Sequence, residues 1–207
     1  IVKNIKYDVI YKIGMQFFYS LGMEGVNELK RIKPDIKIFL DLKLHDIPNT
    51  VHRASKVLGS LGVNYLTLHT SGGSEMMSAG VEGLLEGAQN AGIGSPVALG
   101  VTILTSDPNT DEELMKQRIG VAKDSGCLGL VCSALDLPIV SKQAPDLLTV
   151  VPGIRLSGAE AHDQKKVATQ SKALQEGAGL LVIGRAVTEA ENPTEAAQAI
   201  YAEITNP

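Results

Sequence analysis

The sequence contains no tryptophan, only two cysteines and no excess of positive charge. Aromatic residues make up 4% of its 207 residues, while Gly, Ala, Val, Ile and Leu are abundant, which is typical of tightly packed strands that alternate with helices. Nineteen Lys and Arg against 23 Asp and Glu give a formal net charge of −4, and the basic residues are scattered along the chain. This charge pattern argues against a nucleic-acid partner.

Long apolar runs are also missing. No run reaches the roughly 18 residues that a membrane-spanning helix needs, and no charged-then-apolar leader is recognisable. Cys127 and Cys132 lie in apolar stretches without the companion spacing of a zinc site, so we expect buried, reduced thiols. The sequence therefore predicts a cytoplasmic protein without a membrane partner, folded as a single domain over residues 1–207 around one large core.

The chain does contain a regular alternation of apolar strands and helical patterns. We expect seven strands, at residues 7–14, 37–44, 65–70, 96–104, 129–133, 147–152 and 180–183. We expect helices at residues 17–31, 51–61, 74–91, 111–125, 135–143, 170–176 and 194–204. Continuous apolar strands separated by helices indicate a parallel sheet covered on both faces, either an eight-stranded barrel or a doubly wound sheet.

Polar residues near the ends of the strands favour the barrel, because a barrel builds its site from many strand ends. These residues are Lys12, Asp41, His69, Thr105, Ser133, Arg155 and Arg185. We therefore predict an α/β fold of the (β/α)8 TIM barrel type. Since only seven strands can be counted, we expect the first strand of the barrel to be missing from this sequence.

One predicted strand carries charges that buried strands rarely tolerate. Residues 41–50 read Asp-Leu-Lys-Leu-His-Asp-Ile-Pro-Asn-Thr and follow an apolar run. Alternation along a strand places Asp41 and Lys43 on one face, which in a barrel points inward near the C-terminal rim, and the leucines on the other face, against the outer helices. An isolated Asp-x-Lys is usually a surface ion pair, but here Asp46 and a turn stiffened by Pro48 follow at once. We expect Thr50 to cap the next helix.

The last two predicted strands end in Pro-Gly-Ile-Arg, up to Arg155, and in Ile-Gly-Arg, up to Arg185. Barrels often bind phosphate after their seventh and eighth strands, where Gly lets the backbone approach the ligand and Arg donates to two phosphate oxygens at once. A single Gly-Arg after a strand is commonly a turn with a solvated cation. The long polar loop between the two strands is either a surface excursion or a segment that closes over a ligand.

The decamer at residues 41–50 resembles the signature of orotidine 5'-phosphate decarboxylases, in which an Asp-x-Lys-x-x-Asp-Ile segment carries the catalytic residues. The resemblance extends from about Lys12 to Arg185 and includes Leu-Thr-Ser at residues 104–106, Pro-Gly-Ile-Arg, Asp-Gln-Lys at residues 163–165, and the final Gly-Arg. It implies decarboxylation of orotidine 5'-phosphate to UMP, the last step of de novo pyrimidine biosynthesis, without a cofactor or metal.

The resemblance also implies roles for individual residues. Lys43 protonates C6, Asp41 is the adjacent carboxylate, Lys12 orients Asp41 and contacts the ribose, and Asp46 completes the charged network. The substrate-binding residues that it implies are Lys12, Asp41, Ile47, Thr50, Thr105, Arg155, Gln164, Gly184 and Arg185. It further implies a homodimer in which Asp46, Ile47 and Thr50 reach into the neighbouring subunit's site. The family's Asp at the end of the preceding strand is absent from this sequence.

Two alternatives compete with this interpretation. Barrels similar to 3-keto-gulonate 6-phosphate decarboxylase or hexulose-phosphate synthase share Asp-x-Lys-x-x-Asp but use Mg2+ and typically carry Glu where this chain has Lys12. A non-catalytic barrel that kept only the phosphate site is the second alternative. Lys12 and the Ile-Pro-Asn-Thr turn favour an orotidine 5'-phosphate decarboxylase over the Mg2+-dependent barrels. The intact set of Asp41, Lys43 and Asp46 argues against a non-catalytic barrel. His69 lacks an obvious acid or nucleophile partner, so we expect a structural role for it.

Overall fold

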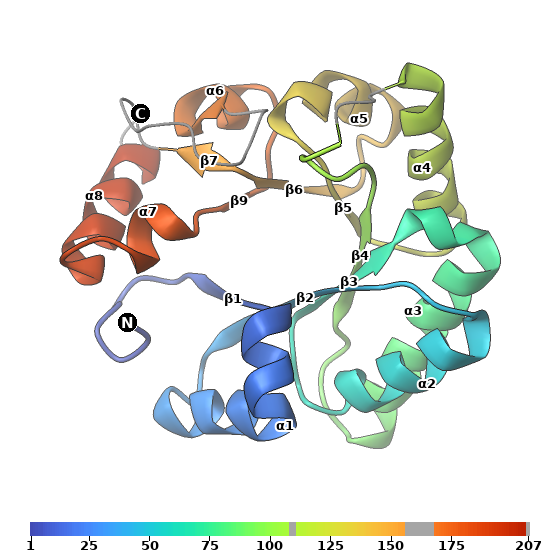
Figure 1. Ribbon diagram of the computed structural model, residues 1–207, viewed down its shortest axis with the longest axis horizontal. Coiled ribbons are helices and arrows are strands. Elements are labelled where there is room, and N and C mark those ends of the chain that lie inside the picture. Colours follow the sequence, from blue (N-terminus) through green and yellow to red (C-terminus); the bar gives the residue numbers. More distant parts are fainter. Residues whose placement is uncertain (108–110, 156–167, 206–207) are drawn as a thin grey trace.

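Seven parallel strands form one sheet in the computed structural model, which describes residues 1–107, 111–155 and 168–205. In spatial order the strands are β1 (Ile10–Gly14), β2 (Lys37–Leu44), β3 (Tyr65–His69), β4 (Val97–Val101), β5 (Gly129–Val131), β6 (Leu148–Pro152) and β9 (Leu180–Val182). Every neighbouring pair is parallel. The sheet curls into a nearly closed barrel (Figure 1), which confirms the predicted fold and its seven strands.

Helices surround the strands on the outside (Figure 1). They are α1 (Met15–Ile32), α2 (Pro48–Gly59), α3 (Gly73–Asn90), α4 (Glu112–Asp124), α5 (Leu137–Gln143), α6 (Gln170–Gln175), α7 (Arg185–Thr188) and α8 (Pro193–Thr205), with short 3-10 turns at Thr70–Gly72 and Ala134–Asp136. None of the helices in the described ranges is both long and apolar enough to cross a bilayer.

Helix α7 and a two-stranded ladder of β7 (Ile154–Arg155) and β8 (Ala168–Thr169) were not predicted from the sequence. Elements of two to four residues are too short to show a hydrophobic period, so a pattern of alternating or helical apolar residues cannot reveal them. The first strand is also shorter than predicted, because it begins at Ile10 instead of residue 7.

The apolar core has two parts, as alternation along inward- and outward-facing strand positions requires. Ile38, Leu40 and Leu42 of β2 are buried in the larger cluster, between the strands and the helices. Phe39 belongs to a second cluster inside the barrel, formed with Leu99, Val101, Val131 and Val150. The predicted orientation of β2, with its leucines toward the helices, is confirmed.

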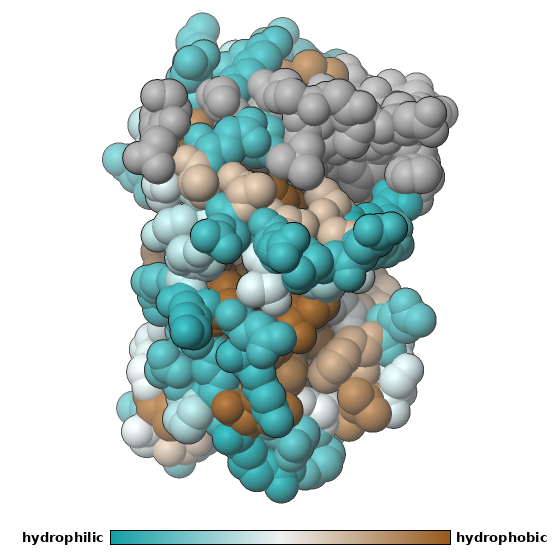
Figure 2. Space-filling view, turned by 90° about the vertical axis from the view of Figure 1, so that its left-hand side faces the viewer, coloured by the Kyte–Doolittle hydropathy of each residue, from teal (hydrophilic) through white to brown (hydrophobic). Residues whose placement is uncertain are grey.

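The strands β1 and β9 form the two edges of the sheet, and no strand among the described residues joins them. Both lie on the side of the molecule that carries the N-terminal segment and α8 (Figure 1). Hydrophobic residues are visible there between hydrophilic ones (Figure 2). The rings of Tyr7 and Tyr201 stack with centroids 4.4 Å apart, which connects the N-terminal segment to α8.

The prediction that Thr50 caps α2 is wrong. The helix begins at Pro48, with Ile47 as its N-cap in an extended conformation and no side-chain cap hydrogen bond. Proline suits the first turn of a helix because its φ is already helical and its missing N–H would have no partner there. Thr50 therefore lies inside the first turn, where its backbone N–H donates to the Ile47 carbonyl at 3.0 Å.

Cys127 and Cys132 are buried and form no disulfide, as expected. Burial raises the pKa of the Cys127 thiol to about 12. Burial, with a smaller contribution from the charge of Asp136, does the same for Cys132. Both thiols therefore stay protonated near neutral pH, which gives them no nucleophilic role.

Candidate active site

Three charged side chains meet at the C-terminal ends of β1 and β2. Lys43 Nζ donates to Asp41 Oδ1 at 2.7 Å, and Lys12 Nζ lies 3.3 Å from Asp41 Oδ2. The parallel register pairs Lys12 with Phe39 and Gly14 with Asp41, so Lys12 on β1 lies two residues before the level of Asp41 on β2 and on the same face of the sheet. The Asp41 side chain is 16% exposed and that of Lys43 27%, which leaves the cluster open to a ligand on one side.

The pKa of Asp41 lies below its ordinary value of 3.8. Burial of the carboxylate by itself raises the pKa, but the hydrogen bond and charge of Lys43 and the charge of Lys12 outweigh burial. Asp41 is therefore ionised at neutral pH and carries a negative charge that two cations balance.

The backbone of β2 departs from regular strand geometry at the site. Lys43 has φ +50°, and it is the one non-glycine residue with positive φ in the described part of the chain. Its N–H donates to Thr67 Oγ1 of β3 at 2.8 Å, and Thr67 Oγ1 also lies 3.2 Å from Asp41 Oδ1. Sequence reasoning missed Thr67, although a single hydroxyl in the apolar run Leu66-Thr67-Leu68 was the available signal.

The structure does not bring Asp46 into this cluster. Asp46 is exposed, and its Oδ1 accepts the Ile47 N–H at 2.7 Å. No ion pair or hydrogen bond between Asp46 and either Asp41 or Lys43 is found among the residues that the structure describes. Ile47 is 65% exposed and Thr50 is also exposed, so the turn that follows β2 is accessible at the rim.

Two histidines lie beside the cluster. The rings of His45 and His69 stack with centroids 5.7 Å apart, and His69 Nδ1 accepts the Ser71 N–H at 3.3 Å, which caps the 3-10 turn after β3. Burial lowers the pKa of His69, and the charges of His45, Arg118 and Lys43 lower it further. The capping hydrogen bond fits the structural role expected for His69. Within residues 1–107, 111–155 and 168–205, no group of three or more His, Cys, Asp or Glu side chains could hold a metal ion.

The two predicted phosphate-binding ends lie side by side, because β6 pairs with β9 and Pro152 is in register with Val182. Gly153 has φ +80°, which favours glycine, and Gly184 precedes Arg185 at the exposed start of α7. Arg155 lies in β7, where it pairs with Thr169. The loop at residues 156–167, which includes Gln164, lies outside the described residues. Thr105 lies in a half-buried turn after β4.

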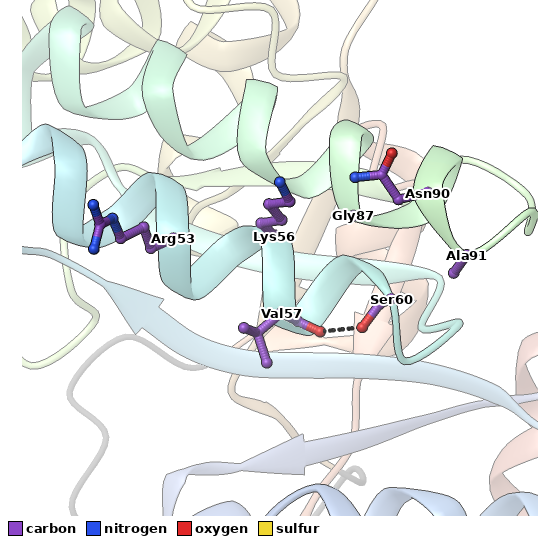
Figure 3. A pocket seen from close by; sticks show the side chains of 7 residues that line it. All are labelled: Arg53, Lys56, Val57, Ser60, Gly87, Asn90 and Ala91. Atoms are coloured by element: carbon purple, nitrogen blue, oxygen red, sulfur yellow. Dashed lines mark hydrogen bonds between the residues drawn. The ribbon is translucent and has the colours of Figure 1, made fainter.

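A surface groove of about 490 Å³ lies elsewhere, between the C-terminal halves of α2 and α3 (Figure 3). Its lining includes Arg53, Lys56, Val57 and Asn90, and Lys56 forms an ion pair with Glu86 at 2.6 Å. Helix C-termini in a barrel lie at the end opposite the C-terminal rim of the strands. The groove is therefore separate from the charged cluster.

Comparison with known proteins gives a consistent result. Residues 1–200 match the model of the "Orotidine 5'-phosphate decarboxylase / HUMPS family". The chain is 46% identical over 199 residues to an orotidine 5'-phosphate decarboxylase from Ligilactobacillus salivarius, covering 89% of this chain and 81% of that protein. It is 43% identical over 208 residues to the orotidine 5'-phosphate decarboxylase from Bacillus cytotoxicus, and the alignment covers 93% of this chain and 85% of that protein. The crystal structure of orotidine 5'-phosphate decarboxylase from Lactobacillus acidophilus superposes with a TM-score of 0.81 at 35% identity, covering 97% of this chain and 88% of that one.

Proposed function

The chain belongs to the orotidine 5'-phosphate decarboxylase / HUMPS family, and we propose that it converts orotidine 5'-phosphate to UMP and CO2 with the cluster of Lys12, Asp41 and Lys43 as its catalytic centre. The reaction is the last step of de novo pyrimidine biosynthesis. The single observation that carries the assignment of the site is the ionised, mostly buried Asp41 between two lysines at the rim of the barrel.

The chemistry requires a cation at the reacting carbon. When the bond between C6 and the carboxylate breaks, its electron pair stays on C6 in the plane of the ring, where no ring π system can spread the charge. Lys43 supplies a fixed positive charge there and then transfers a proton from Nζ to C6, while CO2 leaves. The ion pair with Asp41 stabilises the charged form of Lys43 before the reaction.

Asp41 adds a second effect. Its lowered pKa keeps it ionised, so it repels the substrate carboxylate in the ground state, and this repulsion is relieved as CO2 forms. Lys12 pairs with the other oxygen of Asp41, and we assign the contact with the ribose to it. This position of Lys12 supports the orotidylate reaction over the Mg2+-dependent relatives of the same superfamily, which typically carry Glu there.

The phosphate end supplies binding energy away from the reacting carbon. We assign phosphate contacts to Gly184 and Arg185 and, from the sequence motif, to Arg155 and Gln164, with Thr105 at the base. The adjacent ends of β6 and β9 support the first part of this assignment. Binding energy at the phosphate can organise the charged site around the reacting group.

We also propose that two barrels form a homodimer with shared active sites. Asp46, Ile47 and Thr50 are exposed, and Asp46 makes no contact with Asp41 or Lys43 of its own chain among the described residues, so we propose that these three residues reach the partner's site. Large exposed hydrophobic side chains follow several strands at the same rim, namely Met15, Ile47, Leu104 and Leu135. A two-fold axis between facing rims would bury these side chains and make the exchange of residues reciprocal.

The direct test is decarboxylation of orotidine 5'-phosphate in the presence of EDTA. We expect full activity, because the proposed site uses only side chains. Loss of activity in EDTA that Mg2+ restores would favour the 3-keto-gulonate 6-phosphate decarboxylase or hexulose-phosphate synthase type of barrel. Binding of UMP without turnover under any condition would favour a non-catalytic barrel. The cytoplasmic location remains a prediction from the sequence.

Lys43→Ala tests the proton donor. The variant should lose turnover while it stays folded and binds UMP, because Lys43 serves the reacting carbon and the phosphate contacts remain. Steady-state kinetics and UMP titration of the folded variant measure the two effects separately. Substantial residual turnover would remove Lys43 from this role.

A further inference from the structure

The strand that carries Asp41 and Lys43 contains a bulge. Leu40 pairs with Leu66 and Leu44 with Leu68, so four residue steps on β2 face only two on β3. Lys43 lies within the extra length and adopts φ +50°, a left-handed conformation that a residue with a Cβ avoids unless its surroundings hold it. A bulge next to a reacting group commonly redirects a side chain.

Thr67, opposite the bulge, holds this conformation. Its side chain is fully buried, and its Oγ1 accepts the Lys43 N–H at 2.8 Å, in place of a carbonyl of the strand ladder. A buried backbone N–H needs such a partner, because an unpaired one costs the free energy of desolvation. The hydroxyl proton of Thr67 is left to donate to Asp41 Oδ1 at 3.2 Å or to the Leu40 carbonyl at 3.5 Å.

One hydroxyl therefore joins the two partners of the ion pair. It binds the backbone of Lys43 and the carboxylate of Asp41, while Lys43 Nζ and Lys12 Nζ occupy the remaining sides of that carboxylate. We propose that Thr67 is a positioning residue for the decarboxylation, which keeps Lys43 in its left-handed conformation and thereby aims its ammonium group, together with Asp41, at the reacting carbon. This inference rests on the proposed role of Lys43.

The physical consequence of losing the hydroxyl follows from strand geometry. Without an acceptor for its N–H, Lys43 can relax toward a regular extended conformation, and a change of register by one residue turns a side chain to the other face of the strand. The ammonium group would then spend less time at C6. Because phosphate contacts at the far end of the site are unaffected, the loss should appear in kcat more than in substrate or UMP binding.

The test compares four variants. Thr67→Val removes the hydroxyl at nearly constant shape, Thr67→Ser keeps it, and Lys43→Ala tests the proposed function itself. Thr149→Val is the matched control, because the Thr149 hydroxyl also links two backbone groups: it accepts the Gly179 N–H at 2.9 Å and donates to the Gly177 carbonyl at 2.7 Å. Thr149 lies on β6, away from the charged cluster.

We expect Thr67→Val to lower kcat by about tenfold or more, with KM and the Kd for UMP changed by less than about threefold. Thr67→Ser should recover most of the lost kcat. Thr149→Val should lose a similar amount of stability in urea yet retain near wild-type kcat. Amide hydrogen exchange at Lys43 should be faster in Thr67→Val than in Thr67→Ser.

The proposal is overturned if folded Thr67→Val keeps wild-type kcat, if Thr149→Val loses kcat equally, or if Thr67→Ser shows no recovery. Should Thr67→Val not fold, Thr67→Cys replaces it, since its thiol is a weaker acceptor; wild-type kcat in that variant would count equally against the proposal. If the Lys43→Ala variant is inactive and the Thr67→Val variant is fully active, the positioning role of Thr67 is rejected and the proposed function stands. An active Lys43→Ala would reject the proposed function.

Discussion

At the scale of single residues, the ionised state of Asp41 governs how the cluster of Lys12, Asp41 and Lys43 responds to pH. The carboxylate sits between Lys12 and Lys43, and its pKa in the folded protein is lower than 3.8 despite burial, which acts in the opposite direction. A charge that is stabilised only in the folded state makes folding depend on pH. The same interaction therefore connects the chemistry of the site with the stability of the barrel.

Asp41→Asn should remove this pH-dependent part of the stability. As the pH falls, the unfolded chain takes up the Asp41 proton first, so the stabilisation is fully present well above pH 3.8 and is lost as the pH falls through the lower folded-state pKa. The difference in free energy of unfolding between wild type and Asp41→Asn should be largest near neutral pH and shrink on acidification. Urea unfolding from about pH 3 to about pH 7 measures this difference.

The control for this experiment is Asp8→Asn. Asp8 also pairs with a lysine, Lys37, at 2.8 Å, but both side chains are well exposed. Exposed pairs of this kind contribute little to stability. A wild-type advantage over Asp41→Asn that stays constant across the pH range would contradict the lowered pKa of Asp41.

Arg185→Ala should weaken catalysis through the phosphate. Loss of a charge-assisted hydrogen bond to phosphate should cost about 1.5–3 kcal/mol of transition-state stabilisation, visible mainly in kcat/KM. The comparison substrate is orotidine, which lacks the phosphate, and its slow turnover should change little. If the variant loses as much activity on orotidine as on orotidine 5'-phosphate, the contact is not with phosphate.

At the scale of elements, the close packing of α2 against α3 depends on glycines. A Cβ on Gly87 would lie 2.0 Å from the Lys56 carbonyl oxygen, and one on Gly83 would lie 2.2 Å from the His52 carbonyl oxygen. Both obstacles are backbone atoms of α2, which cannot move aside as a flexible side chain can. At these two positions the backbones of α2 and α3 can therefore approach this closely only because α3 has a glycine there.

Gly87→Ala should force α2 and α3 apart and lower the free energy of unfolding by about 1–3 kcal/mol, as overpacking usually does. Gly120 on α4 provides the matched control, because a Cβ there would meet nothing within 4 Å. Gly120→Ala should be neutral or raise stability by up to about 1 kcal/mol, since alanine favours helix more than glycine. Urea unfolding of both variants measures the two changes in free energy of unfolding. If these changes are equal, close packing is not the reason for glycine at position 87.

At the scale of the whole molecule, the exposed position of Asp46 outside the charged cluster poses the question of which barrel it serves. The structure of one chain places Asp46 away from Asp41 and Lys43, while the turn that carries it exposes Ile47 at the rim. In the proposed dimer this turn completes the partner's site. The prediction that follows concerns pairs of subunits and not single chains.

Mixing inactive Lys43→Ala protomers with inactive Asp46→Ala protomers should restore activity after subunit exchange. One site of each heterodimer then combines an intact Lys43 with the partner's intact Asp46, while the opposite site carries both lesions. Random exchange should recover about a quarter of the wild-type activity, because half of the dimers are mixed and half of their sites are intact.

The control mixture combines Lys43→Ala with Asp41→Asn. Asp41 and Lys43 belong to the same strand and the same site, so each site of that heterodimer keeps one lesion and no activity should return. If the first mixture also stays inactive after verified exchange, or if a fully active monomer is found at assay concentration, Asp46 serves its own barrel.

The alternation of apolar strands and helices predicted a parallel α/β fold and the inward face of β2, and the polar residues at the strand ends favoured the barrel over a doubly wound sheet. Strand periodicity predicted that Leu40 and Leu42 pack against helices and that Asp41 and Lys43 share the inner face, and the buried leucines and the 2.7 Å ion pair confirm it. This worked because side-chain direction along a strand depends on neighbouring residues in the sequence. The Gly-Ile-Arg that follows β6 and the Gly-Arg that follows β9 were found as sequence motifs, and β–α order predicted that the two strand ends lie at one rim.

Only the tertiary structure decided how Lys43 is held and that Asp46 stays outside the cluster of Lys12, Asp41 and Lys43. The left-handed conformation of Lys43 depends on an acceptor from Thr67, which is 24 residues away in the sequence and becomes a neighbour only when β2 and β3 pair. Helix α2 begins at Pro48 and leaves Thr50 inside its first turn, whereas the pattern of residues alone had suggested a cap at Thr50. Periodic patterns report which face a side chain shares with its near neighbours in sequence, but hydrogen bonds between strands depend on the register in which those strands meet.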